Sequence, residues 1–181
     1  MSHAQIAVLA VAAVLVFWMV GAYNRLVALR NAIGAAWALV DDVLKKRGDA
    51  VDALVQGLRE PLAAEQNALD ALLGAERQVR TAAAALTVRP VDAALAAAVV
   101  VAEAGMASAA SRVLSLLEQQ DALRHEPSVA PHATVLRDSV AKLAFSRQLF
   151  NEATEAYNAA VRLFPTKLLA DLYRFGPAGK L

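Results

Sequence analysis

Few side chains in this 181-residue chain are suited to catalysis or metal binding. The chain has no cysteine, which excludes disulfides, thiol nucleophiles and cysteine-ligated metal sites. His125 and His132 lie seven residues apart in a proline-containing segment, without further ligands at the spacing of a zinc site. Asp41 and Asp42 lack the Glu-x-x-His partner motif of a helical di-iron site. We therefore expect no enzymatic activity, no cofactor, no metal and no small-molecule substrate, and we interpret these residues as solvated.

Four asparagines are the most informative polar residues. Asn24 is followed by Asn31 seven residues later, and Asn151 is followed by Asn158 at the same spacing. Each pair therefore lies on one side of its helix, at the repeat of a coiled coil. One interpretation is a polar ladder between the first and last long helices, which fixes their register or receives a partner. The other is that the asparagines are exposed. We favour the ladder because helical propensity does not select asparagine.

An apolar run from residue 4 to residue 22 contains no charged side chain. A helix of about 20 residues crosses a hydrocarbon core of about 30 Å. The rival interpretation, a cleaved signal peptide, calls for a basic N-terminal region, and residues 1–3 contain no lysine or arginine. Trp18 and Tyr23 lie near the end of the run, where aromatic rings favour the membrane interface. We expect residues 1–22 to form an uncleaved, single-pass anchor.

Basic residues give the expected orientation. Arg25 and Arg30 follow the run closely, and Lys45–Arg47 lie further on. Basic residues near a span tend to stay on the cytoplasmic side. We therefore expect the bacterial inner (cytoplasmic) membrane, with the N-terminus outside and the C-terminal domain in the cytoplasm. Across the whole chain, 18 Lys and Arg balance 17 Asp and Glu, which argues against nucleic-acid binding.

The remaining sequence predicts helices throughout. Apolar residues from Ile33 to Leu58 alternate at four and three residues, broken only by Arg47, which predicts a helix to about Arg59. Pro61 marks its end. Further helices are expected at about 62–86, 91–123 and 135–164, with a linker at 125–134 whose prolines stop both neighbours. The seam of the last one is expected to contain Leu136, Val140, Leu143, Arg147, Phe150, Thr154, Tyr157, Val161 and Phe164.

These helices predict an all-α fold: an N-terminal transmembrane helix followed by an elongated antiparallel four-helix bundle, residues 23–165, and a short C-terminal amphipathic helix. The amphipathic tail, residues 166–181, returns beside Tyr23 if the helices alternate in direction. It then either lies in the membrane interface or caps the open end of the bundle, and both can hold at once. We expect four basic residues to form a rim at this end of the bundle: Arg25, Arg30, Lys167 and Arg174. This rim either attracts anionic lipid or is simply solvated.

Two separated blocks resemble the LemA family. The first comprises Tyr23–Asn31, Ala36-Trp37 and Leu44–Arg47; the second comprises Phe150-Asn151, Tyr157-Asn158, Phe164-Pro165 and Leu168–Gly176. Between them only helical character and Val101–Ala104 agree. The chain departs from the family pattern at Asp52-Ala53 and at Glu60-Pro61, near the end of the first helix. The resemblance implies a membrane-anchored antiparallel helical bundle.

Two functional hypotheses follow. The first is a non-enzymatic, membrane-anchored scaffold or protein-interaction module, which contacts the lipid bilayer and either forms a homo-oligomer or docks other membrane proteins. The anchor, the long seams and the lack of catalytic groups favour it. The alternative is an extracytoplasmic sensory or ligand-binding bundle, which requires the opposite orientation in the membrane.

Overall fold

The computed structural model describes residues 2–181, and the regular elements in that range are all helices. The predicted all-α class is therefore confirmed. The elements are α1 (His3–Leu58), the 3-10 turn η1 (Ala63–Glu65), α2 (Gln66–Val88), α3 (Ala93–Glu118), α4 (Asp121–Arg124), α5 (Ala130–Arg162) and α6 (Thr166–Leu172).

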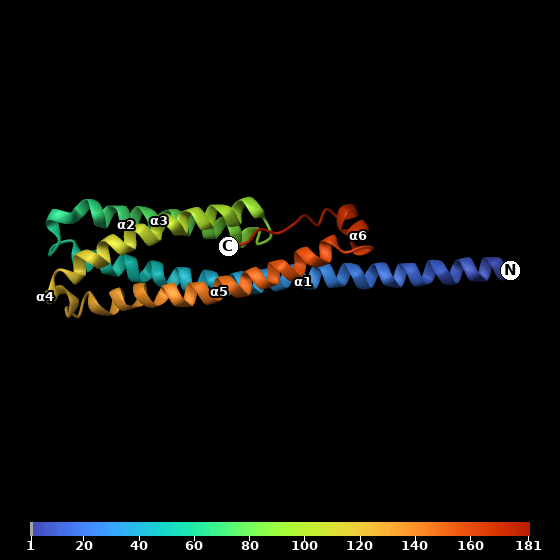
Figure 1. Ribbon diagram of the computed structural model, residues 1–181, viewed down its shortest axis with the longest axis horizontal. Coiled ribbons are helices and arrows are strands. Elements are labelled where there is room, and N and C mark those ends of the chain that lie inside the picture. Colours follow the sequence, from blue (N-terminus) through green and yellow to red (C-terminus); the bar gives the residue numbers. More distant parts are fainter. Residues whose placement is uncertain (1) are drawn as a thin grey trace.

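α1 is one continuous helix of 56 residues. A capping box starts it: the Ser2 hydroxyl accepts from the Gln5 amide, and the Gln5 side chain accepts from the Ser2 amide at 2.8 Å. No proline and no turn interrupts the helix, which ends at Leu58, shortly before Pro61. At 1.5 Å per residue the helix is about 84 Å long. Its N-terminal part projects beyond all the other helices (Figure 1).

The four long helices run along one axis, and successive ones alternate in direction (Figure 1). α1 packs along α5 and along α2, and α2 packs along α3. The fourth side is different, because α3 makes little direct contact with α5. The helical body is therefore closed on three sides and open along the α3–α5 side.

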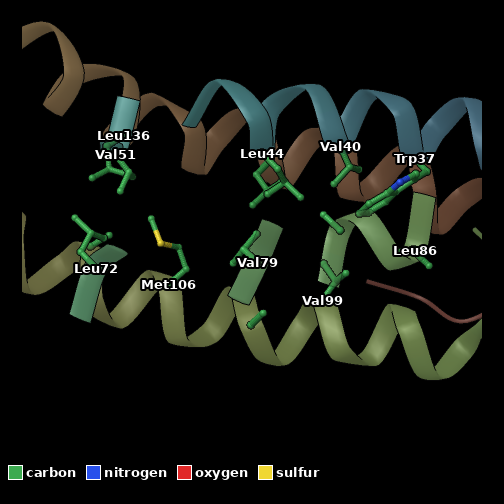
Figure 2. Close-up of a cluster of buried hydrophobic side chains, with 14 of the residues drawn as sticks. Trp37, Val40, Leu44, Val51, Leu72, Val79, Leu86, Val99, Met106 and Leu136 are labelled. Atoms are coloured by element: carbon green, nitrogen blue, oxygen red, sulfur yellow. The ribbon is translucent and has the colours of Figure 1, made fainter. Parts of the chain in front are cut away.

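The core confirms the predicted seam of α1. Its buried members point toward α2 and α3, where Val79, Leu86, Val99 and Met106 face them (Figure 2). Trp37 is the largest of these side chains; its ring meets Phe150 of α5 edge to face at 6.0 Å, and its indole N–H donates to the Thr87 hydroxyl at 2.9 Å. The buried apolar seam of α1 comprises Leu26, Ile33, Trp37, Val40, Leu44, Val51, Leu54 and Leu58, and the adjacent Ala50 and Val55 are buried as well.

Two predicted helix boundaries were wrong. α3 ends at Glu118 rather than near residue 123, because Gln120 adopts an extended backbone and the chain turns into the short α4. α5 begins at Ala130, inside the predicted linker, so Pro131 does not stop a helix. It lies in the first turn of α5, where a missing amide hydrogen costs no hydrogen bond.

The predicted seam of α5 was also partly wrong. Val140 is 71% exposed, Phe164 is 75% exposed and Arg147 is only half-buried. Ser139 and Ser146 are buried instead, and their hydroxyls donate to the carbonyls three residues earlier. Because α3 does not close onto α5, the side of α5 that carries Val140 and Arg147 faces an open groove, not a core.

We predict that Phe150→Ala destabilises the body by about 3–5 kcal/mol, because it leaves a cavity beside Trp37 in a fully buried site. Urea unfolding of the full chain in detergent, followed by tryptophan fluorescence, measures the change. Phe145→Ala on the same helix is the matched control; Phe145 is 64% exposed, so its replacement should stay within about 0.5 kcal/mol. Equal losses in the two variants would contradict the assigned core.

Candidate functional site

The last residues of the chain form an extended segment that lies back along α5. Asn158 holds it with two hydrogen bonds: its amide nitrogen donates to the Ala178 carbonyl at 2.9 Å, and its oxygen accepts from the Ala178 amide at 2.8 Å. Asn151 repeats this pattern on Leu181, with both distances 2.8 Å. The Tyr157 hydroxyl donates to the Gly176 carbonyl at 3.0 Å. We call residues 176–181, held in this way, the clasped tail.

The polar ladder between the first and last long helices was therefore wrong. Asn151 and Asn158 direct their side chains to the clasped tail, while Asn24 and Asn31 are exposed on α1. The seven-residue spacing still has a structural meaning. Two turns of α5 advance about 10.5 Å, which an extended chain covers in about three residues, and the two asparagines bind residues 178 and 181.

The backbone of the clasped tail packs closely against the backbone of α3 at Gly179. A Cβ added to Gly179 would lie 2.6 Å from the Ala93 Cα, at the start of α3. Only glycine allows the tail to pass this point without displacing α3. The tail thereby bridges α5 and α3 at one end of the open side, and Lys180 adds an ion pair with Glu155.

The clasped tail covers only one end of the α3–α5 side. The rest of this side forms a groove of about 770 Å³. Leu181 lies beside Val100 and Arg147, where the groove begins. Small and apolar side chains make most of its walls, and charged groups lie at its floor and far end. The walls include Val100, Ala104, Ala107 and Ala110 from α3, and Val140 and Ala144 from α5; the charged groups are Arg47, Glu103, Glu118, Arg137 and Arg147.

A buried ion pair forms part of the groove floor. Arg47 of α1 donates through both terminal nitrogens to the Glu103 carboxylate of α3, one of these bonds being 3.0 Å. Both residues are less than a tenth exposed. Breaking such a pair leaves an uncompensated buried charge, which costs about 3–5 kcal/mol. Because α1 and α3 are not direct neighbours, this pair joins opposite corners of the helical body.

Glu76 of α2 lies beside this pair in the interior. Its carboxylate is 4.0 Å from Arg47 and 3.7 Å from Arg80, which also reaches Asp52 at 3.2 Å. Burial raises the pKa of Glu76 to about 7; the two arginines lower it, and Glu103 and Asp52 raise it further. Glu76 therefore exchanges a proton near neutral pH inside the core. Gly48 of α1 leaves the space that this carboxylate occupies.

The sequence pattern pointed to one member of this cluster, Arg47, but did not show that it forms a buried ion pair. Arg47 was the only interruption in the apolar seam of α1, and a charged residue at a seam position must be paired to be buried. Its partners could not be identified: Glu76 lies in an alanine-rich helix without a distinguishing pattern, and Glu103 belongs to the family-like segment Val101–Ala104, which does not indicate a partner. Asp41 and Asp42, by contrast, form ordinary surface pairs with Lys45 and Lys46.

The expected basic rim consists of four exposed residues. Arg25 and Arg30 lie on α1, Lys167 on α6, and Arg174 just after it. The amphipathic tail, residues 166–181, returns to Tyr23 as predicted. The centroid of the Tyr23 ring lies 5.1 Å from that of the Tyr173 ring. Lys167 pairs with Asp171 at 2.8 Å, so its charge is partly neutralised.

We predict that Asn158→Ala releases the clasped tail. Two hydrogen bonds worth about 1 kcal/mol each correspond to about a 30-fold increase in local opening. Hydrogen exchange at the Ala178 amide, measured by mass spectrometry of the full chain in detergent, reports it. Asn31→Ala is the control, because Asn31 is exposed. Unchanged exchange at residue 178 in Asn158→Ala would contradict the clasp.

We predict a pH-dependent stability contribution from Glu76. Its pKa is higher in the folded than in the unfolded chain, so the contribution is full below about pH 4.5 and is lost as pH rises through about 7. Urea unfolding at about pH 5 and about pH 8 should show a smaller pH effect in Glu76→Gln than in the unmodified chain. Glu60→Gln, an exposed carboxylate, should leave the pH effect unchanged. Parallel profiles for Glu76→Gln and the unmodified chain would refute this assignment.

Comparison with known proteins identifies the family of the chain. No curated protein is similar enough to be matched to the chain. A family model described as the LemA family matches residues 36–180. This range contains the buried Arg47, Glu76 and Glu103, both clasp asparagines and nearly all of the clasped tail; the block Tyr23–Asn31 lies before it. Since the match covers most of the chain, the protein belongs to the LemA family.

Proposed function

We propose that this protein is a non-enzymatic, membrane-anchored scaffold: a four-helix bundle held at the bacterial inner membrane by a single N-terminal span. The observation that carries the proposal is the projecting part of α1. Its most apolar 18-residue window has a mean hydropathy of 2.5 and is entirely unburied by the rest of the chain. Large side chains such as Phe17, 78% exposed, find no protein partner there within the described residues. A bilayer supplies the surroundings that these side chains need.

α3 also satisfies the length and hydropathy of a membrane helix, with a mean hydropathy of 1.8, but its environment favours a different role. It packs along α2, buries Val99, Met106 and Val113, and places Glu103 in a buried ion pair with Arg47. A charged residue in the hydrocarbon region is costly. These contacts support α3 as a helix of the folded body and leave α1 as the single span.

The orientation in the proposal follows from charge. Arg25 and Arg30 come directly after the apolar part of α1 and are exposed. Such residues tend to remain in the cytoplasm, which supports an outside N-terminus and a cytoplasmic body. In this position the body presents its open α3–α5 side to cytoplasmic partners, including a second copy of the chain.

The size of the groove favours one other function. A volume of about 770 Å³ falls in the range of small-molecule pockets, about 300–1,000 Å³. A ligand-binding or sensory bundle facing the outside of the cell is therefore the second candidate. It differs from the scaffold in the side of the membrane on which the body lies, so topology separates the two.

The test uses the absence of native cysteine. We prepare two single-cysteine variants: Ser2→Cys, before the span, and Ser128→Cys, in the exposed turn at the far end of the body. A membrane-impermeant maleimide is added to intact spheroplasts. The scaffold proposal predicts labelling at residue 2 and protection at residue 128 until the membrane is permeabilised.

The reverse pattern would replace the scaffold by the extracytoplasmic candidate. Labelling at both positions would contradict the span itself, because the two residues would then lie on one side. The matched control is the unmodified chain, which has no thiol and should take up no label.

A further inference from the structure

An exposed apolar surface lies at the end of the helical body from which α1 projects. α6 and the turn before it lie at this end, beside α1 (Figure 1). Leu168 and Leu172, four residues apart, share one side of α6 and are 60% and 70% exposed. Leu163 and Phe164, in the preceding turn, are 59% and 75% exposed. We call these four side chains the apolar foot.

The opposite side of α6 is fixed to the body. Leu169 is 5% exposed and Ala170 is fully buried, so α6 has one packed face and one face without a protein partner among the described residues. Capping the body requires only the packed face. The foot therefore remains unexplained by packing within the chain.

An aromatic cluster sets the position of α6 along α1. The Tyr23 ring lies 5.1 Å from that of Tyr173 and 6.0 Å from that of Phe175, between centroids. Tyr23 is the residue that follows the uncharged run 4–22. Tyrosine favours the boundary between hydrocarbon and headgroups. The ring contacts therefore place α6 at the depth where the span leaves the bilayer.

The charges around the foot match an anionic surface. Arg25, Arg162 and Arg174 are exposed near this end and form no ion pair within the described residues, and Lys167 adds a fourth cation. Exposed leucine and phenylalanine next to arginine is the composition of a segment that lies in the plane of a membrane interface.

We propose that the apolar foot is a second membrane contact, inserted at the headgroup level of an anionic bilayer beside the span. This inference rests on the proposed anchoring by α1 and adds a site that holds the body against the membrane surface. The body is then attached at two points, Tyr23 on α1 and the foot on α6, so that α1 does not act as a free tether.

The experiment places one environment-sensitive fluorophore, NBD, at a single introduced cysteine in the full chain. The three variants are Leu172→Cys in the foot, Phe17→Cys in the span and Phe145→Cys on the exposed side of α5. Each substituted side chain is more than 60% exposed, so the body should fold in all three. The chain is reconstituted in vesicles of equal parts phosphatidylcholine and phosphatidylglycerol, with and without brominated acyl chains.

The proposal predicts strong bromine quenching at residue 17, clear quenching with blue-shifted emission at residue 172, and none at residue 145. Quenching at 17 with residue 172 behaving like residue 145 would overturn the foot and leave the anchor intact. Absence of quenching at residue 17 would overturn the anchor itself. Blue-shifted emission at 172 that disappears when protein is diluted into more lipid would show that a second copy covers the foot, and would also overturn the proposal.

Phosphatidylcholine vesicles test the electrostatic part. There, quenching at residue 172 should fall relative to residue 17, because the arginines lose their anionic partner. Equal quenching in the two lipid mixtures would refute recognition of anionic headgroups.

Discussion

The continuity of α1 is the constraint on which the remaining structure depends. A single helix runs from His3 to Leu58 with no proline or turn, so the segment that projects and the segment that forms the core cannot move independently. Helices α2 and α5 pack directly on it, and the aromatic contacts of Tyr23 bring the end of the chain back to it. An even number of long passes then places α6 at the same end of the body as the projecting segment.

The interior combines an apolar core with a small, buried charge cluster. Arg47, Glu76 and Glu103 come from three different helices and meet where the 4-3 pattern would place another leucine. Buried ion pairs add little stability compared with apolar packing, but they penalise any arrangement that separates the partners. The cluster therefore disfavours a shift of α2 or α3 along α1, because such a shift would separate the partners.

Most of the fold could be predicted from periodicity, because each long helix buries an apolar stripe and the prolines lie near its ends. Pro131 was misread, since a proline in the first turn of a helix has the same local sequence as one that stops it. Val140 and Arg147 were misassigned to a core because periodicity marks a face without revealing whether a neighbour covers it. The clasped tail could not be predicted from the sequence, because an irregular extended segment leaves no periodic pattern of apolar residues. Asn151 and Asn158 indicate that hydrogen-bond partners are required, but they do not show which residues those partners are.

The stiffness of α1 has a mechanical consequence in the proposed arrangement. From Tyr23 to Leu58 the helix covers about 54 Å at 1.5 Å per residue. Membrane helices tilt to match local bilayer thickness, by about 20° on average. A change in tilt of about 10° at the span would swing the far end of the body by about 9 Å. In the proposed arrangement, small differences in bilayer thickness are therefore converted into displacement of the membrane-distal end of the body.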